Sequence, residues 1–93
     1  MPDKIQTLHP AGKNGVNIDK GKYEMIKEAI IDCFQNKKEL SFADLNQTIK
    51  KSLAGRFDGK IPWYVETVKL DLEARGLIER LPGQSPQILR LKN

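Results

Sequence analysis

Two side chains in the sequence, His9 and Cys33, are of the types that perform nucleophilic or general-base catalysis. Such chemistry needs a nucleophile and a base in contact, and these are the only histidine and the only cysteine of the chain. His9 stands beside Pro10 in a polar arm, whereas Cys33 falls on the apolar stripe of an expected helix, where a thiol packs as a small hydrophobe. The alternatives, a reactive thiol and a His9 base or ligand, lack an evident partner. We expect no catalytic site.

Metal and cofactor binding are not expected either. A zinc site needs several Cys or His ligands at close spacing, and the chain has one residue of each type. It contains no Gly-x-Gly-x-x-Gly and no Gly-Lys-Ser/Thr phosphate loop. The best-placed carboxylates, Asp58 and those in Asp71-Leu72-Glu73, are of a kind that usually lies solvated on a helix face. The sequence therefore predicts a protein that binds macromolecules and is not an enzyme.

The composition is that of one small globular domain. The chain has 93 residues, of which 39% are hydrophobic and 30% charged. One cysteine excludes an internal disulfide and fits a reducing compartment, and the polar start lacks the apolar core of a signal peptide. No apolar run is long enough to span a membrane. We expect a cytoplasmic protein whose net charge of +4 permits a nucleic-acid partner.

The first 18 residues are predicted to form an N-terminal arm. Apolar and polar residues alternate weakly over Ile5–Leu8 and again over Val16–Ile18, with the turn signal Asn14-Gly15 just before the second stretch. This pattern predicts a short strand or a loose hairpin that packs on the edge of the domain.

Residues 19–93 are predicted to form a domain of three helices followed by a β-hairpin. Asp19 and Ser41 are suitable N-caps, and Gly55 and Gly76 are suitable stops. With the apolar spacing, these signals place a helix over 20–36, a second between Ser41 and Gly55, a third over 62–75, and strands over 77–81 and 87–91 joined by a turn over 82–86.

A resemblance supports this order of elements. The stretch 65–80 has an aliphatic stripe followed by Glu-Ala-Arg-Gly-Leu-Ile, and it resembles the junction between the third helix and the wing of winged helix-turn-helix domains. Trp63-Tyr64, the Leu-Asp-Leu-Glu-Ala-Arg-Gly run and the Leu-His-Pro arm are also similar to a small uncharacterised bacterial winged-helix family. The resemblance covers residues 19–92. It implies a mainly α, α+β fold with double-stranded DNA as the partner, because such third helices enter the major groove.

The third helix has one face that suits a core and one that suits DNA poorly. At helical spacing, Val65, Val68 and Leu72 share the core face. The opposite face carries acids at its flanks, and acids repel phosphate, whereas bases are read mainly by Arg, Lys, Asn and Gln. This opposite face consists of Trp63, Thr67, Leu70 and Ala74, flanked by Glu66 and Asp71.

Nine side chains are the candidates for DNA contact. Those between the second and third helices are expected to hold phosphates, with ordinary solvated lysines as the alternative. Those on the third helix would enter the groove, and the last two would lie on the wing. In this order they are Lys50, Lys51, Arg56 and Lys60; Trp63, Thr67 and Lys69; and Arg80 and Arg90.

The alternative to DNA binding is a protein-interaction or dimerisation module. Trp63, Leu70 and Ala74 form an apolar row of a kind that monomers tend to cover. Three covers remain open: a second copy of the chain, another macromolecule, or the N-terminal arm through Ile5, Leu8, Val16 and Ile18.

Overall fold

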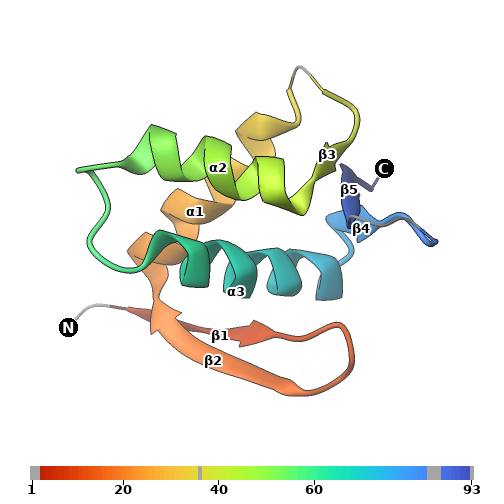
Figure 1. Cartoon of the computed structure of the whole chain (residues 1–93). Coiled ribbons are helices and arrows are strands. Elements are labelled where there is room, and N and C mark those ends of the chain that lie inside the picture. Colours follow the sequence, from red (N-terminus) through yellow and green to blue (C-terminus); the bar gives the residue numbers. More distant parts are fainter. Residues whose placement is uncertain (1–2, 36, 84–86, 93) are drawn as a thin grey trace.

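The computed structural model describes residues 3–35, 37–83 and 87–92, which form a small α+β unit with three helices and short antiparallel strands (Figure 1). The elements in chain order are β1 (Lys4–Leu8), β2 (Asn14–Asp19), α1 (Lys20–Cys33), β3 (Leu40–Ser41), α2 (Phe42–Leu53), α3 (Ile61–Ala74), β4 (Ile78–Arg80) and β5 (Ile88–Leu91). No helix in these described ranges is long and apolar enough to cross a membrane.

The predicted helix boundaries are confirmed at the capped ends. The Asp19 carboxylate accepts from the Lys22 amide at 2.9 Å, and the Ser41 hydroxyl accepts from the Asp44 amide at 3.1 Å. Gly55 and Gly76 follow α2 and α3 with positive φ angles of 73° and 77°, which only glycine adopts without strain. Helix α1 ends three residues earlier than predicted, at 33 against 36. Asn36 and residues 84–86 of the predicted turn lie outside the described residues.

The core lies where the three helices meet the small sheet. Val65, Val68 and Leu72 of α3 are fully buried, as the helical spacing predicts. The other buried apolar side chains come from every layer, so no single element could bury its apolar face alone. They are Ile18, Tyr23, Ile26, Ile30, Phe34, Leu40, Leu45, Ile49, Leu53, Ile78 and Leu89. Because Ile18 belongs to this core, the arm and the rest of the chain pack as one body.

The second sheet has the strand order β3-β5-β4, with both pairs antiparallel. The predicted C-terminal hairpin is formed by β4 and β5, with Glu79 opposite Arg90. Strand β3 was not predicted. Its two residues pair with Leu89 and Ile88, so β5 becomes the central strand.

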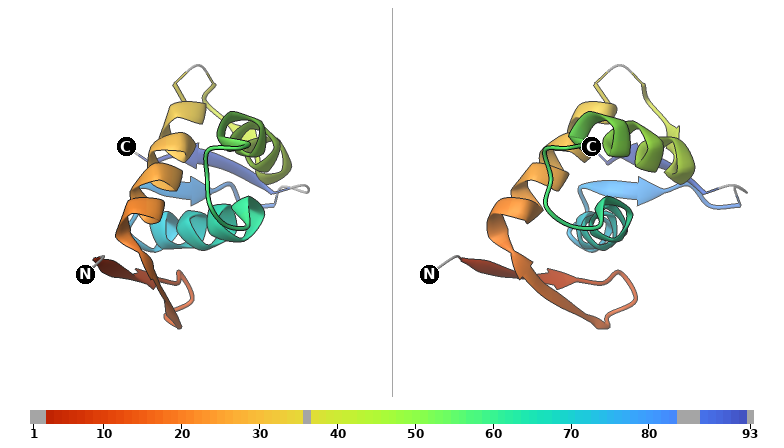
Figure 2. Two further views of the ribbon diagram at one scale, coloured as in Figure 1. Left: turned by 90° about the vertical axis from the view of Figure 1, so that its left-hand side faces the viewer. Right: turned by 60° about the vertical axis from the view of Figure 1, so that its left-hand side comes forward.

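The N-terminal arm forms a β-hairpin that ends directly in α1 and lies on the opposite side of α3 from α2 (Figure 2). The pairing of β1 with β2 shifts register between Gln6 and Leu8. At this bulge the buried Thr7 hydroxyl takes the place of a backbone group, since it bonds both the amide of Val16 at 2.9 Å and its carbonyl at 3.0 Å. A Cβ at Gly15 would overlap the carbonyl and hydroxyl oxygens of Thr7, so this position requires glycine.

Candidate nucleic-acid interface

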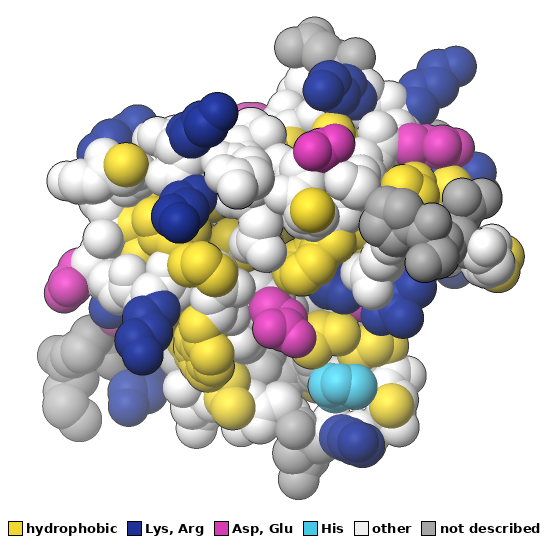
Figure 3. Space-filling view, viewed as in Figure 1, with side chains coloured by type: hydrophobic (Ala, Val, Ile, Leu, Met, Phe, Trp, Pro, Cys, Tyr) yellow, Lys and Arg dark blue, Asp and Glu magenta, His cyan; other side chains and the backbone are white. Residues whose placement is uncertain are grey.

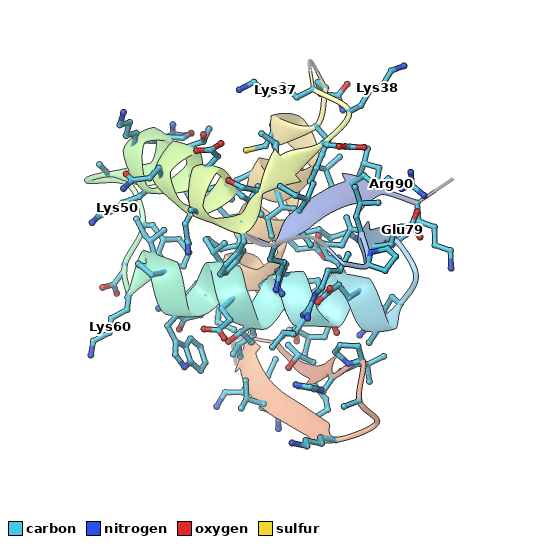
Figure 4. The ribbon with its side chains drawn as sticks, turned by 45° about the vertical axis from the view of Figure 1, so that its right-hand side comes forward. Lys37, Lys38, Lys50, Lys60, Glu79 and Arg90 are labelled. Atoms are coloured by element: carbon cyan, nitrogen blue, oxygen red, sulfur yellow. The ribbon has the colours of Figure 1, made fainter. Side chains whose placement is uncertain are left out.

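The four cations predicted to hold phosphate lie together at one end of the molecule, here called the basic end (Lys50, Lys51, Arg56 and Lys60). Lys50 and Lys51 occupy the last turn of α2, Arg56 lies in the following loop, and Lys60 is the N-cap residue of α3. The end of α2 and the beginning of α3 lie on the same side of the molecule, and Lys50 and Lys60 point outward there (Figures 1 and 4). All four side chains are exposed.

None of these four cations takes part in an ion pair within the part of the chain that the structure describes. Asp58, in the same loop as Arg56, is exposed and reduces the net charge of this end to three positive charges. Lysine and arginine side chains gather over the end of α2 and the beginning of α3 (Figure 3). The free ends of Lys50 and Lys51 also suit the negative end of the α2 dipole, which is a structural role for the same charges.

An aromatic cluster lies beside the basic end, at the start of α3. Trp63 is 45% exposed and meets the Tyr64 ring edge-on, with ring centroids 4.9 Å apart. The Phe57 ring also meets the Tyr64 ring edge-on, with ring centroids 5.0 Å apart. The ammonium of Lys22 lies 5.5 Å from the centre of the Tyr64 ring and adds a fifth cation to this region. Sequence reasoning missed Lys22, because it lies in the first turn of α1 and only the fold brings it to α3.

The N-terminal hairpin partly covers the predicted DNA-reading face of α3. Thr67 and Leu70 are half-buried and line a shallow pocket of about 290 Å³ together with Leu8 and Val16 of the hairpin and with Trp63. Ala74 is half-buried too. Of the three possible covers, the arm therefore occupies this face in part, and Thr67 is no longer free to enter a groove.

The prediction that Lys69 contacts DNA is wrong, because its side chain is buried and only 3% exposed. Its ammonium donates to the Gln87 amide oxygen at 2.8 Å, lies 3.2 Å from the Glu73 carboxylate and stands over the Phe42 ring. Desolvation lowers the pKa of Lys69, and the neighbouring Glu73 carboxylate opposes that shift. Lys69 therefore holds α3 to α2 and to the start of β5, and presents no charge to a partner.

The two predicted wing cations are paired with glutamates. Arg90 donates to Glu79 across the β4–β5 pair at 2.6 Å, and Arg80 lies 3.6 Å from Glu73. About half of each arginine side chain is exposed. These pairs are exposed enough to exchange partners, but each arginine has a local acid that competes with phosphate.

The prediction that Asp71 flanks the exposed face of the third helix is also wrong, because Asp71 is fully buried. Its carboxylate accepts from the Leu8 amide at 2.8 Å, from the Tyr23 hydroxyl, and from Arg75 at 2.8 Å. Burial first, and then this carboxylate, raise the pKa of Tyr23, so the phenol stays protonated. Asp71 therefore fastens the hairpin and α1 to α3. Glu66 is the acid of this region that remains exposed.

His9 and Cys33, the two residues considered for catalysis, lie in different elements. The His9 ring accepts from the Ala11 amide at 3.1 Å within the hairpin turn. Cys33 is half-buried at the end of α1, where burial raises the pKa of its thiol. Within residues 3–35, 37–83 and 87–92, no group of three or more His, Cys, Asp or Glu side chains is placed to hold a metal ion.

The chain is thus a small α+β domain with a basic end, a partly covered third helix and a paired C-terminal hairpin. Residues 4–89 match a family described as "Family of unknown function (DUF6958)", and the chain belongs to this family. No curated protein matches the chain.

Proposed function

We propose that this protein is a non-enzymatic winged helix-turn-helix protein that binds double-stranded DNA. The order α1-β3-α2-α3-β4-β5, with a third helix followed directly by a β-hairpin, supports this more specific fold, as does the sequence resemblance over residues 19–92. In that arrangement α3 is the helix that approaches the major groove, and the β4–β5 hairpin is the wing.

The observation that carries the proposal is the basic end. Four exposed cations converge on the α2–α3 connection, which contains one exposed acid, Asp58, and none of the four takes part in an ion pair among the described residues. The first turn of α3 lies beside them. Backbone phosphates dominate the affinity of proteins for DNA, and cations that are free to release counterions supply it. The free amides and positive dipole of the α3 N-terminus favour a phosphate at the same place. The basic end therefore grips the DNA backbone where α3 begins.

The same geometry implies little reading of sequence. Base edges are read mainly by Arg, Lys, Asn and Gln, and Lys69 is buried while Thr67 lies against the hairpin. The exposed residues at the front of α3 include Trp63 and the acidic Glu66. Binding is therefore governed by phosphates, with discrimination among sequences limited to contacts near Trp63.

The test is fluorescence anisotropy of a labelled mixed-sequence duplex, titrated with protein at several salt concentrations. The variant Lys50→Ala/Lys51→Ala/Lys60→Ala is compared with Lys37→Ala/Lys38→Ala/Lys92→Ala, which removes the same charge elsewhere. The basic-end variant is expected to lower the slope of log K against log salt by about 0.9 for each phosphate that the protein no longer neutralises. The control keeps most of the slope. Equal reductions of the slope in both variants, or no binding by the unmodified protein at low salt, would contradict the proposal.

A protein-interaction or homodimer function is the second candidate. It is favoured by an exposed apolar patch where the hairpin meets α3. In this patch Trp63, Leu8 and Val16 are each more than 40% exposed around one shallow pocket. Sedimentation equilibrium of the unmodified protein and of Trp63→Ala tests this candidate. A dimer that dissociates in the folded Trp63→Ala variant supports it, with Leu70→Ala as a second probe of the row. A monomer at all concentrations rules out the homodimer.

A further inference from the structure

A second surface lies at the opposite end of the molecule, in a groove between the loop 37–39 and strand β5. Its volume is about 620 Å³, which is within the range of ordinary ligand sites. Lys37 and Lys38 stand on the loop, while Arg90 extends from the strand beside Glu79 (Figure 4). This β5 groove is lined by Phe34, Lys37, Lys38, Glu39, Glu79, Arg90, Leu91 and Lys92.

The groove exists because β3 is short. Strand β3 pairs with β5 only through Leu40 and Ser41, opposite Leu89 and Ile88. The chain before β3 then leaves the sheet, so the end of β5 has no hydrogen-bonded strand on that side among the described residues.

The backbone of Leu91 faces this open side. The Leu81 amide donates to the Ile88 carbonyl, and the Lys92 amide donates to the Leu77 carbonyl. With the β4–β5 register, these bonds assign residues 88 and 90 of β5, and Lys92 just after it, to the hydrogen-bonded pairs of this ladder. In an antiparallel ladder the alternate residues turn their N–H and C=O groups to the other edge. Leu91 therefore offers a donor and an acceptor to a further strand.

The charge of the groove selects the partner. Four cations meet two glutamates there, which leaves an excess of two positive charges. Arg90 is already paired with Glu79, at 2.6 Å. Lys37, Lys38 and Lys92 are exposed and belong to none of the ion pairs of residues 3–35, 37–83 and 87–92. Glu39 is the remaining acid of the lining, so an acidic partner meets three unpaired ammonium groups and one carboxylate, an excess of two positive charges.

The apolar part of the groove, here called its floor, consists of Phe34 and Leu91. Phe34 is only 7% exposed, so the half-buried Leu91 supplies most of the accessible apolar surface. In a strand, successive side chains point to opposite faces, so a peptide beside Leu91 can rest one apolar side chain on this floor and direct its neighbours to the lysines.

We infer that the β5 groove binds an extended acidic segment of a partner protein, which adds as a short strand beside Leu91. Main-chain bonds to Leu91 provide affinity, carboxylates meet Lys37, Lys38 and Lys92, and one apolar side chain covers Phe34. A DNA backbone meets the lysines but makes no use of the strand edge or of the apolar floor, so the acidic peptide is the better occupant.

The test uses a blocked, fluorescein-labelled peptide in which glutamate alternates with phenylalanine and leucine, and a matched peptide with glutamine in place of glutamate. Anisotropy is expected to show saturable binding of the acidic peptide alone. The variant Lys37→Ala/Lys38→Ala/Lys92→Ala is expected to weaken it about tenfold or more, since removing each rim charge weakens a partly exposed interaction. Lys50→Ala/Lys51→Ala/Lys60→Ala, with the same change in net charge, is expected to bind it normally.

Amide exchange measured by NMR provides a second readout that does not depend on net charge. The acidic peptide is expected to slow exchange of the Leu91 amide and to leave that of Arg90, already bonded to β4, nearly unchanged. Equal binding of both peptides, equal weakening by both triple variants, or an unprotected Leu91 amide overturns the inference. Loss of duplex DNA binding on changing Lys37, Lys38 and Lys92 would instead assign the groove to DNA, and also overturns it. The DNA proposal for the basic end is read independently in the other variant.

Discussion

The two halves of α3 use the same kinds of charged side chain in different ways. At its beginning, Lys60 is exposed and has no acidic partner among the described residues. Towards its end, Lys69 and Arg75 are bound to Glu73 and Asp71 on the same helix. The charge at the beginning of α3 is thus free to interact with another molecule, whereas the charges towards its end hold the hairpin and the strands.

The difference arises from what packs on each half. The hairpin reaches α3 through Leu8, whose amide needs an acceptor once it leaves water, and the Asp71 carboxylate supplies it. A buried carboxylate in turn requires donors, which Tyr23 and Arg75 provide. Charge on this half is therefore committed to the fold.

The largest effect is expected for Asp71→Ala. This change leaves the Leu8 amide and the Tyr23 hydroxyl without their acceptor in a buried site, which should lower the free energy of unfolding by about 3–5 kcal/mol. Urea denaturation measures it, with Asp58→Ala at an exposed position as the control. A decrease as small as that of the control would show that Asp71 does not hold the hairpin.

Gly15→Ala should distinguish the role of the hairpin in stability from the role of the basic end in DNA binding. The added Cβ would overlap Thr7, so the bulge must shift at a cost of about 1–3 kcal/mol in unfolding free energy. Gly12→Ala, in the open hairpin turn, meets no neighbouring atom and shows the cost of backbone strain at a φ of 80° without any overlap. Unchanged DNA binding by folded Gly15→Ala is expected, because the basic end is formed by α2 and α3. Loss of DNA binding in that variant would show that the basic end depends on the hairpin.

Lys69→Met and Lys60→Met should have opposite effects. Lys69→Met leaves buried Glu73 without its neighbouring ammonium and should destabilise the fold by about 1–3 kcal/mol, with little change in DNA binding. Lys60→Met should weaken DNA binding at low salt and leave thermal stability nearly unchanged. The comparison of α3 halves is wrong if Lys69→Met weakens DNA binding more than Lys60→Met does.

The smallest effect is expected on the β4–β5 hairpin. Arg90→Ala removes an exposed pair with Glu79 and should change stability by about 0.5 kcal/mol or less. Its effect on DNA affinity should also be small, because Glu79 already competes for the guanidinium. If Arg90→Ala lowers DNA affinity as much as Lys60→Met does, the β4–β5 hairpin is part of the DNA interface.

Local signals in the sequence were sufficient for most helix ends. The caps Asp19 and Ser41 and the stops Gly55 and Gly76 act within a few residues, so they located the ends that they mark. The end of α1 has no such stop and was predicted three residues too late. The two-residue strand β3 was missed because its pairing with β5 depends on tertiary packing and leaves no alternation to detect.

The exposure of the basic end was predictable from the sequence, and its role in DNA binding stays a prediction. Charged side chains at helix ends and in loops usually remain in water, as those of the basic end do. The roles of Lys69 and Asp71 depend on Gln87, which is 18 residues away, and on Leu8, which is 63 residues away. No periodicity within α3 carries that information, so both residues were assigned to an exposed face.

The most direct test of the DNA proposal is a chemical-shift titration of the ¹⁵N-labelled protein with a mixed-sequence duplex at low salt. The account predicts that the perturbed amides lie in residues 50–63, and that those of residues 69–80 change little. Perturbations centred on residues 69–80 would contradict the division of α3 into a free half and a committed half. No perturbation at any amide would contradict DNA binding itself.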